Sequence, residues 1–456
     1  MNLSNYINNN IVDDKIIVFS DNSIFSIITT FSIIKSYHTC IPLNPDISNS
    51  ELNYILNNSK CTHIFCEKKY MDRFSPNLNL YTESILDMLK FNKCACQDNY
   101  IIKHNDSIFT SLILFTSGST GLPKGVVLTN ENLIYSVDSS VDMIHIVDTD
   151  ILLYIIPYYH IYGFILLCLV LKSFGSIVIS KNSLFSNSIL NVIREYSCSV
   201  FPGVPSSYNI MFENSRFSNN FLPTLTTFIC TSGVLPENFS QEILNRFPKC
   251  EFYNIYGQTE AGGPIAISNS EMLKKNSSTI GVPVKNINVQ ILSEDSKICH
   301  SGEVGELVVS GKNISKQYFN DNEESNKVFV NNTLHTKDLV TMDDNGYIYY
   351  LGRKRNIIKV SGYRFNALEI ENVLNQIPQV KDVSVIGVSD DVLGEAVKAF
   401  VILAENDKSL TEKEILNFCT KKLPIYKIPK YIQFVDNIPT NNMGKVMYKS
   451  LESNFK

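Results

Sequence analysis

Along residues 15–256, short runs of β-branched and aromatic residues alternate with longer stretches whose apolar positions recur at helical spacing. The runs read KIIVFS, TCIPL, THIFC, SLILFT, GSIVIS, CSVFP and LTTFIC. The helices predicted between them are Ser48–Asn57, Asn130–Ile146, Ser188–Tyr196 and Glu237–Arg246. Because strands that alternate with helices form βαβ units, this pattern predicts an α/β fold with largely parallel sheets.

The pattern changes after about residue 279. The runs NINVQILS, GELVVSG and GYIYYLG, separated by Gly, Asp and Asn, predict antiparallel strands and a small β-barrel-like part at 279–351. After Gly352, a basic stretch RKRNIIK precedes a compact α+β segment with a helix near Thr411–Lys422. We therefore expect a large N-terminal domain (1–352) and a small, mobile α+β C-terminal domain (353–456).

Composition narrows the class of protein. The chain has 456 residues, of which 44% are hydrophobic and 19% charged, enough for more than one buried core. Its net charge of -5 gives no electrostatic attraction for nucleic acid, so no nucleic-acid partner is expected. The longest apolar run, Ile161–Leu171, is too short to cross a bilayer, and the N-terminus lacks the pattern of a signal peptide. We expect a soluble cytoplasmic protein without integral membrane association.

The distribution of the cysteines is also typical of a cytoplasmic protein. Eleven are scattered along the chain, mostly in apolar runs, which predicts reduced thiols buried as small hydrophobic side chains. Cys94 and Cys96 form the one close pair, but no second pair or nearby histidines accompany them, so a zinc site is not expected.

The stretch LFTSGSTGLPKG, Leu114–Gly125, contains the most distinctive chemistry. It has the ingredients of a phosphate-binding loop, namely glycines for close backbone approach, several hydroxyls and a lysine. A Walker loop places Gly before its lysine and a magnesium-binding Ser or Thr after it. Here Pro123 precedes Lys124 and Gly125 follows it. The stretch therefore predicts a phosphate loop of another type.

This loop closely resembles the signature loop of the adenylate-forming superfamily, which includes acyl-CoA synthetases, peptide-synthetase adenylation domains and luciferases. Further motifs follow in the order of that family and cover essentially residues 15–450. They read CIPLNPDISNSELNYILNNS (40–59), IPYYHIYGF (156–164), YNIYGQTEAGG (253–263), LHTKDLV (334–340), GRKRNIIKVSGYRFNALEIE (352–371) and IPTNNMGKV (438–446).

The resemblance implies a large domain, a small mobile lid domain, and a two-step reaction. ATP and a carboxylate form an acyl-adenylate and release pyrophosphate, and a thiol of coenzyme A or of a carrier protein's phosphopantetheine then accepts the acyl group. Such chemistry brings anions together, so we expect catalysis mainly by positioning and positive charge.

Roles follow by resemblance for the ATP-binding residues. In the signature loop, Thr116, Ser117, Thr120 and Lys124 would hold the β- and γ-phosphates, with Gly118, Ser119 and Gly121 completing the loop. Tyr256 would stack on adenine beside Gly257, and Thr259 would contact the α-phosphate. Glu260 would bind Mg²⁺, a cation that prefers oxygen ligands. Asp338 would accept the ribose hydroxyls, and Arg353 would contact ribose or phosphate.

The remaining roles concern the acid and the second step. Lys445 would bridge the substrate carboxylate and the α-phosphate, and His160, at the start of a helix beside the acyl pocket, would shape that pocket or gate entry. Gly362 would line the thiol tunnel, where a side chain would block the path. Arg355 falls at the hinge position, where the family more usually has Asp or Lys.

The chain departs from the family pattern in four places. It begins late in the family's large domain, and TSGVLPE (231–237) is a loose version of a loop that borders adenine and substrate. Lys337 replaces the Gly of the T-G-D motif, and Tyr448 stands where an Arg often follows the catalytic lysine. None of these changes removes a residue that the resemblance makes essential.

The resemblance leaves the substrate open. Members that activate amino acids commonly have an Asp for the α-amine in the region that reads YYHIYGF here. We therefore favour an aryl or aliphatic carboxylate, transferred to coenzyme A or to an acyl or peptidyl carrier protein. The alternatives are a stand-alone amino-acid adenylation enzyme, a noncatalytic nucleotide- or acyl-adenylate-binding relic, and a luciferase-like oxygenase.

Overall fold

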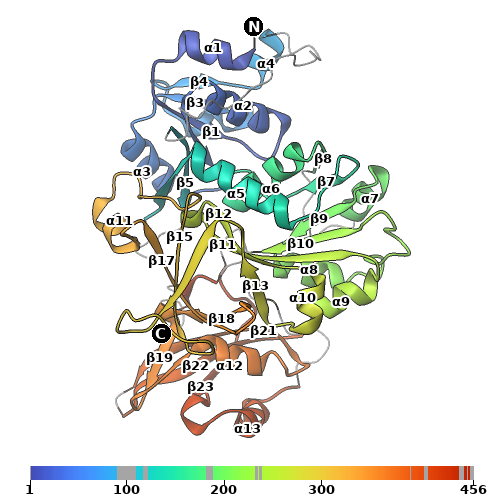
Figure 1. Cartoon of the computed structure of the whole chain (residues 1–456), viewed down its shortest axis with the longest axis vertical. Helices are drawn as coiled ribbons and strands as arrows, with labels where there is room; N and C mark the ends of the chain where they lie inside the picture. The colour runs from blue at the N-terminus through green and yellow to red at the C-terminus, as the bar shows by residue number, and fades with distance from the viewer. Residues whose placement is uncertain are drawn as a thin grey trace.

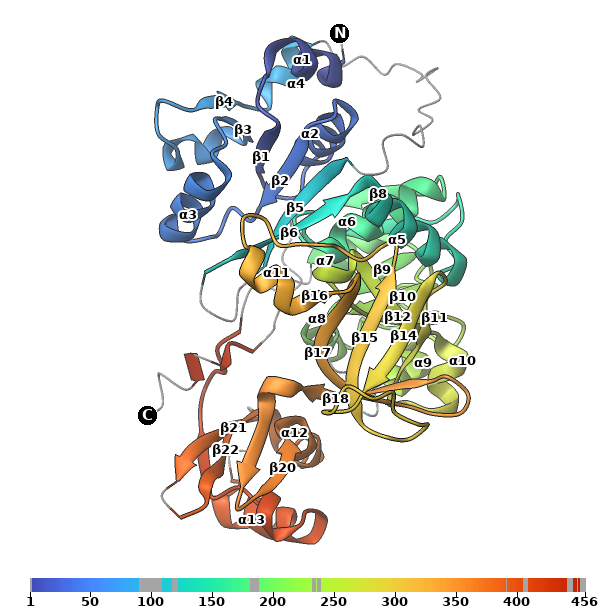
Figure 2. The same ribbon diagram turned by 60° about the vertical axis from the view of Figure 1, so that its left-hand side comes forward.

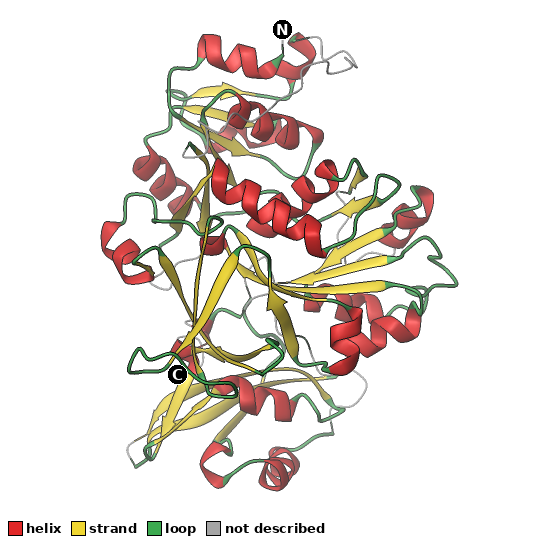
Figure 3. Ribbon diagram, in the orientation of Figure 1, coloured by secondary structure: helices red, strands yellow, loops and turns green. Residues whose placement is uncertain are grey.

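The computed structural model describes residues 2–89, 109–116, 122–180, 188–231, 235, 239–390, 392–404, 409–440, 446–448 and 450–451. These residues form a mixed α/β structure whose strands assemble into three sheets (Figure 3). The predicted α/β fold class is thus confirmed. In Figure 1 the three sheets follow one another down the long axis of the molecule, in the order of the chain.

The first sheet has six strands in the order β4-β3-β1-β2-β5-β6, parallel except for the hairpin β5–β6. Its strands are β1 Lys15–Phe19, β2 Thr39–Leu43, β3 His63–Cys66, β4 Asn79–Tyr81, β5 Thr110–Thr116 and β6 Lys124–Thr129. Its helical segments are α1 Leu3–Asn10, α2 Ile24–Lys35, α3 Asn49–Ser59, η1 Lys68–Arg73 and α4 Ser84–Met88.

The second sheet has twelve strands and changes character midway. The strands β8, β7, β9, β10 and β11 pair in parallel, and β12 onwards pair antiparallel. The parallel strands are β7 Ile151–Tyr154, β8 Ser176–Ile179, β9 Val200–Gly203, β10 Thr227–Thr231 and β11 Glu251–Gln258. The others are β12 Gly263–Ser268, β13 Thr279–Pro283, β14 Ile287–Leu292, β15 Gly305–Gly311, β16 Phe329–Val330, β17 Thr333–Met342 and β18 Ile348–Arg353.

Helices cover the parallel half of this sheet. They are α5 Asn130–Met143, α6 Ile161–Lys172, α7 Ser188–Glu195, α8 Pro205–Phe212, α9 Phe239–Arg246 and α10 Ser270–Lys275, with η3 Thr259–Ala261 and α11 Asn322–Val328 near the antiparallel strands. The helices α5 and α6 lie between the two larger sheets (Figure 1). Their apolar residues join one continuous core with side chains of both sheets.

The third sheet has five strands, β19 Ile357–Val360, β20 Tyr363–Asn366, β21 Val380–Asp390, β22 Gly394–Leu403 and β23 Tyr431–Phe434. Its helical segments are α12 Ala367–Leu374, α13 Glu412–Lys422 and η5 Ile425–Lys427. One short segment, η4 Lys354–Asn356, links the last strand of the second sheet to the first strand of the third. Figure 2 shows the third sheet beyond β18, apart from the larger sheets.

Local sequence explains where several helices begin. Ser48 before α3, Thr129 before α5 and Thr411 before α13 each accept the N–H of the residue three positions on, whose side chain bonds back to the cap. Such reciprocal bonds satisfy N–H groups that a helix start leaves open.

The prediction that the helix of α5 extends to Ile146 is wrong. The backbone becomes extended at Ile144, and the N–H of His145 donates a hydrogen bond to Tyr253 Oη.

The antiparallel strands predicted at 279–351 are confirmed as β13–β18, which extend the parallel half into one continuous sheet. The division into domains 1–352 and 353–456 stays a prediction.

The nine cysteines in the described ranges carry no disulfide, whereas Cys94 and Cys96 lie outside them. Over the same ranges, no helix combines the length and apolar character needed to cross a membrane.

Candidate functional site

Four segments of distant sequence meet where the parallel and antiparallel halves of the second sheet join. They are the ends of the β5–β6 hairpin, the turn from β11 through η3 to β12, the segment that follows β15, and the paired strands β17 and β18. The hydrogen bonds, the ion pair and the ring contact described below connect these segments. Most of the residues predicted from sequence to bind ATP lie on them.

Asp338 is the centre of one cluster. It lies on β17, is only 2% exposed, and is directly opposite Arg353 in the register of β17 and β18. Its Oδ2 accepts hydrogen bonds from Tyr256 Oη at 2.5 Å and from Gln258 Nε2 at 2.6 Å. The β11 motif and the T-K-D motif are thereby joined through one carboxylate, although 82 residues separate Tyr256 from Asp338.

The second oxygen of this carboxylate is less occupied. Arg353 Nε lies 2.9 Å from Asp338 Oδ1 as an ion pair, but Oδ1 accepts no well-aligned hydrogen bond from the residues that the structure describes. Buried carboxylate oxygens ordinarily have such donors. Although burial lowers the pKa of Arg353, the charge of Asp338 raises it above its ordinary value. Arg353 therefore stays charged beside Asp338, and Oδ1 of Asp338 lacks an aligned hydrogen-bond donor.

Two tyrosine rings lie beside this carboxylate. The ring centroids of Tyr256 and Tyr350 are 6.0 Å apart, and the ring planes are inclined at 43°. Burial, followed by the charge of Asp338, raises the pKa of Tyr256 well above its ordinary value. The hydroxyl therefore stays protonated and can donate to Asp338, while the apolar ring can stack on a flat ligand.

A second cluster contains Glu260 and Lys124. Tyr318, from the segment after β15, is 5% exposed and donates its hydroxyl to Glu260 Oε1 at 2.8 Å. The Nζ of Lys124 lies 5.5 Å from the centroid of the same ring. The Ser315 N–H also donates to the backbone oxygen of Glu260 at 2.9 Å. Tyr318 thus connects the predicted magnesium ligand with the lysine of the predicted phosphate loop.

Lys124 has an acidic partner as well. Its Nζ lies 2.7 Å from Glu324 Oε1, on α11, and its side chain is 12% exposed. Lys124 pairs with Thr116 across the β5–β6 hairpin. Ser117, Gly118, Ser119, Thr120 and Gly121 lie outside the described residues. The structure therefore defines the two ends of the predicted phosphate loop and the environment of its lysine.

The turn that carries Thr259 and Glu260 is tightly packed against itself. Gly257 lies so close to the returning strand that a Cβ atom at this position would come 2.2 Å from the backbone oxygen of Gly263. Gly262 closes η3 with φ +67°, a left-handed conformation that glycine adopts without strain. The glycines in YGQTEAGG therefore allow the hairpin that brings Glu260 to Tyr318.

His160 immediately precedes α6. Its Nε2 is buried without a hydrogen-bond partner in the described part of the chain, and its ring contacts that of Tyr159 at 4.9 Å between centroids. Burial lowers the pKa of His160 to about 4, so the imidazole is neutral at pH 7. A Cβ at Gly163 would come 2.1 Å from the oxygen of Pro157, which explains the glycine of this motif.

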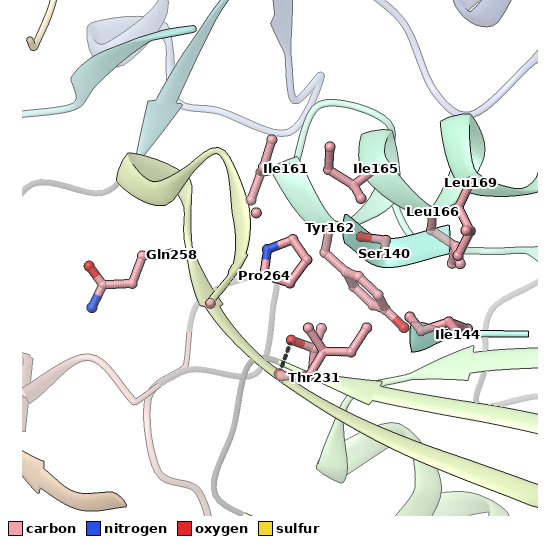
Figure 4. Close-up of a pocket in the computed structure, with 13 residues that line it drawn as sticks. Ser140, Ile144, Ile161, Tyr162, Ile165, Leu166, Leu169, Thr231, Gln258 and Pro264 are labelled. Atoms are coloured by element: carbon pink, nitrogen blue, oxygen red, sulfur yellow. Dashed lines mark hydrogen bonds between the residues drawn. The ribbon is translucent and has the colours of Figure 1, made fainter. Parts of the chain in front are cut away.

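An apolar pocket of about 60 Å³ lies beside the β11 turn (Figure 4). Side chains of α6 form one wall, among them Ile161, Tyr162 and Leu166, and the β11–β12 hairpin forms another. Gln258 points away from these side chains, toward Asp338. The pocket therefore lies on one side of the β11 turn and the carboxylate cluster on the other.

Comparison with known proteins identifies the family. The sequence profile described as AMP-binding enzyme matches residues 6–319, and that of the AMP-binding enzyme C-terminal domain matches residues 369–445. The chain belongs to the AMP-binding enzyme family. The resemblance to adenylate-forming enzymes predicted from the motifs is therefore confirmed.

Relatives of this AMP-binding enzyme include named acid–thiol ligases. The long-chain-fatty-acid–CoA ligase of Escherichia coli O6:H1 is 28% identical over 87% of this chain and 70% of its own length. The 4-coumarate–CoA ligase 3 of Oryza sativa subsp. japonica is 29% identical over 74% of this chain and 63% of its own length. These relatives bear out the predicted class, an AMP-forming acid–thiol ligase.

Solved structures of similar fold bear out the architecture. ATP-bound MatB from Rhodopseudomonas palustris superposes with a TM-score of 0.89 at 23% identity, covering 99% of this chain and 91% of that one. The o-succinylbenzoate CoA synthetase MenE from Bacillus subtilis, in complex with ATP and magnesium ion, gives a TM-score of 0.85 at 23% identity, with coverages of 99% and 91%.

Not every predicted site residue of this AMP-binding enzyme joins the two clusters. Lys445 lies outside the described residues; Thr440 and Val446, on either side of its loop, pair as an antiparallel bridge. Gly362 lies in the exposed turn between β19 and β20 with φ +88°, and a Cβ there would meet no atom within 4 Å. Its role in a thiol tunnel stays a prediction.

Several residues of the clusters were not predicted from the sequence. Gln258 is the variable position of its motif, and Tyr318, Glu324 and Tyr350 lie between the quoted motifs. Tyr318 had a weak signal, since it is an aromatic residue in a polar stretch, NISKQYFNDNEE. The hydrogen bond from Tyr318 to Glu260 spans 58 residues, so nothing local in the sequence indicates it.

Proposed function

We propose that this AMP-binding enzyme activates an aryl or aliphatic carboxylic acid as an acyl-adenylate and transfers the acyl group to the thiol of coenzyme A. The observation that carries the proposal is the pair of clusters on either side of the Thr259–Glu260 turn. One offers a buried carboxylate, one oxygen of which lacks an aligned hydrogen-bond donor, beside aromatic rings, which suits a nucleoside. The other offers a lysine and a carboxylate linked by Tyr318, which suits polyphosphate with a cation.

In the first half-reaction, a carboxylate oxygen of the acid bonds to the α-phosphorus of ATP. The bond from that phosphorus to the oxygen bridging the α- and β-phosphates breaks, and pyrophosphate leaves with its electron pair. Asp338 would accept the ribose hydroxyls, the Tyr256 ring would pack on adenine, and Arg353 would contact ribose or phosphate. Thr259 would contact the α-phosphate. Lys445 would offset the repulsion between the carboxylate and the α-phosphate.

The pyrophosphate end has its own binding groups. Thr116, Ser117, Thr120 and Lys124 would hold the β- and γ-phosphates with the glycines of the signature loop. The contact of Lys124 with Glu324 would be exchanged for phosphate when ATP binds. Glu260, oriented by Tyr318, would supply a carboxylate oxygen to Mg²⁺, which usually keeps several waters and phosphate ligands besides one or two carboxylates. Bound Mg²⁺ would neutralise charge on the leaving group.

The apolar pocket supports an acid without an α-ammonium group. Most of its lining side chains are aliphatic, and the polar ones, such as Ser140, Thr231 and Gln258, carry no charge. No acidic residue lines it in the described ranges, so no carboxylate there would pair with an amine. An apolar chain or ring fits such walls through removal of apolar surface from water. His160, neutral and next to Ile161 at the start of α6, would shape the entrance.

In the second half-reaction, the thiolate attacks the acyl carbon and AMP leaves as the carbon–oxygen bond breaks. We favour coenzyme A as acceptor because the relatives at 28–29% identity are named CoA ligases. A carrier protein's phosphopantetheine presents the same thiol and is the alternative. The unpaired cysteines in the described ranges support a reducing, cytoplasmic setting.

Pyrophosphate exchange into ATP, measured with a panel of fatty, aryl and α-amino acids, tests the proposal. We expect exchange with at least one fatty or aryl acid and not with amino acids. Lys445→Ala should reduce it by about 100-fold or more, the order seen when one transition-state donor is lost. Lys421→Ala removes an exposed lysine on α13 and is the matched control, expected to retain full exchange.

The other outcomes separate the alternatives. Exchange with amino acids alone would identify an amino-acid adenylation enzyme. No exchange with any acid, together with retained ATP binding, would identify a nucleotide-binding relic and contradict the proposal. Thioester formation with coenzyme A and with phosphopantetheine carrier proteins, measured side by side, distinguishes the two acceptors.

A further inference from the structure

Glu306, on β15, is a buried carboxylate next to the nucleoside cluster and is not among the residues assigned a role above. It is only 7% exposed. Carboxylates are rarely buried unless they are paired. Its partners come from the segments that carry Asp338 and Arg353, so they indicate what the residue does.

The contacts of Glu306 flank both members of the Asp338–Arg353 pair. Its Oε1 accepts the backbone N–H of Lys337, the residue before Asp338, at 3.3 Å. Its Oε2 accepts from Nζ of Lys354, the residue after Arg353, at 3.1 Å. One carboxylate therefore holds β17 and the end of β18 at the point where these two strands present their charged side chains.

The charges around Glu306 are mainly positive. Lys337 Nζ lies 3.7 Å and His335 Nδ1 lies 3.5 Å from Oε1. Burial raises the pKa of Glu306, but the hydrogen bond from Lys354 and the charges of Lys337, Lys354 and His335 bring it below its ordinary value. The carboxylate is therefore ionised at neutral pH, and its hydrogen bonds are charge-assisted.

The backbone conformation of Lys337 explains why these contacts are needed. Lys337 has φ +62°, in the left-handed region that residues with a Cβ adopt only under strain. The T-G-D pattern has glycine at this position, which takes that conformation without strain. In this chain the lysine must be held there, and a change of its φ would rotate the following Asp338 away from Tyr256 and Gln258.

We propose that Glu306 is a positioning residue for ATP, which holds the left-handed Lys337 and thereby directs Asp338 at the ribose hydroxyls, while Lys354 extends the same support to Arg353. The inference rests on the proposed function, because it takes Asp338 as the ribose acceptor. It adds a residue that contacts no substrate and acts through the two neighbours of the charged pair.

The test uses steady-state pyrophosphate exchange with the full chain and an acid that supports it. Glu306→Ala should raise the KM for ATP by about tenfold, as expected for loss of a charge-assisted hydrogen bond. The KM for the acid should stay within about twofold, because the apolar pocket lies on the other side of the β11 turn. Lys337→Gly should alone leave the KM for ATP nearly unchanged.

The double variant is the decisive measurement. Because glycine adopts a positive φ freely, Lys337→Gly combined with Glu306→Ala should restore most of the lost ATP affinity, which a general loss of stability would not permit. Glu303→Ala, which removes an exposed carboxylate of the preceding turn, is the matched control and should leave both KM values unchanged.

Three outcomes would overturn the inference: an unchanged KM for ATP in Glu306→Ala, an equal rise of both KM values, or no recovery in the double variant. If Glu306→Ala does not fold, Glu306→Gln decides, because its amide oxygen can still accept the Lys337 N–H but carries no charge. A smaller rise in the KM for ATP, again relieved by Lys337→Gly, supports the inference; no rise contradicts it. Absence of exchange in the unmodified chain would contradict the proposed function instead.

Discussion

Buried polar residues of the site differ in the partners that they have. Asp338 is buried with the guanidinium of Arg353 beside it and with hydrogen bonds from Tyr256 and Gln258. His160 has no such partner for its Nε2 in the described part of the chain, so burial lowers its pKa to about 4. Burial without a hydrogen-bond partner therefore keeps the imidazole of His160 neutral at pH 7, whereas the carboxylate of Asp338 is buried among donors.

The low pKa of His160 makes the stability of the fold depend on pH. In the unfolded chain a histidine titrates at about 6.5, so below that pH the unfolded state binds a proton that the native state does not. The free energy of unfolding should therefore fall as the pH drops from about 6.5 to about 4. By pH 5 this group accounts for a loss of roughly 1–2 kcal/mol.

Urea unfolding of the unmodified chain and of His160→Gln at pH 7 and pH 5 measures this term. The variant should lose roughly 1–2 kcal/mol less than the unmodified chain between the two pH values. His300→Gln, at an exposed histidine, is the control and should follow the unmodified chain. Equal pH dependence of the unmodified chain and His160→Gln would show that folding does not lower the pKa of His160, and would contradict the prediction.

At the scale of elements, short turns between strands position the reactive side chains. The β5–β6 hairpin ends at Thr116 and Lys124, and the β11–η3–β12 turn carries Thr259 and Glu260. Sequence predicted both as functional because their residue types match motifs. It did not predict the close backbone approach at Gly257, since the opposing carbonyl belongs to the returning strand.

Gly257→Ala tests that approach. A Cβ 2.2 Å from the Gly263 oxygen forces the hairpin apart, so we expect a loss of about 1–3 kcal/mol in stability and at least a tenfold loss of pyrophosphate exchange. Gly302→Ala is the matched control, because Gly302 has φ +82° but open space around a Cβ. It should cost about 1 kcal/mol from backbone strain and leave exchange intact. Thermal unfolding and exchange assays measure both, and equal effects of the two variants would exclude the steric explanation.

At the scale of the whole molecule, the link between the second and third sheets is short. The three residues of η4, Lys354–Asn356, connect β18 to β19. Arg364 and Glu294 form an ion pair across the two sheets at 2.9 Å, but both side chains are more than half exposed. Exposed pairs contribute at most about 1 kcal/mol, so this contact cannot lock the third sheet in one orientation.

If the C-terminal part alternates between two orientations for the two half-reactions, a stiffened η4 should affect them unequally. Arg355→Pro fixes φ in the middle of η4. We expect pyrophosphate exchange within about threefold of the unmodified chain, and thioester formation reduced by at least about tenfold, because that step requires the movement. Single-turnover assays of the two steps measure this. Arg355→Ala, which removes the charge but keeps rotation about φ, is the control and should reduce neither step as much as Arg355→Pro reduces thioester formation. A parallel loss of both steps in Arg355→Pro would contradict a hinge at this position.

The sequence by itself determined the order and type of most elements, the family, and the identities of Lys124, Glu260 and Asp338 as candidate site residues. These features depend on local patterning and on motifs of adjacent residues, which a linear sequence preserves. Only the tertiary structure decided that Tyr318 orients Glu260, that Gln258 bonds Asp338, and that Glu306 supports the strained Lys337. These contacts join residues that are 58, 80 and 31 positions apart. Their physical basis is the pairing of strands and the burial of polar groups, which bring such residues together only in the folded chain.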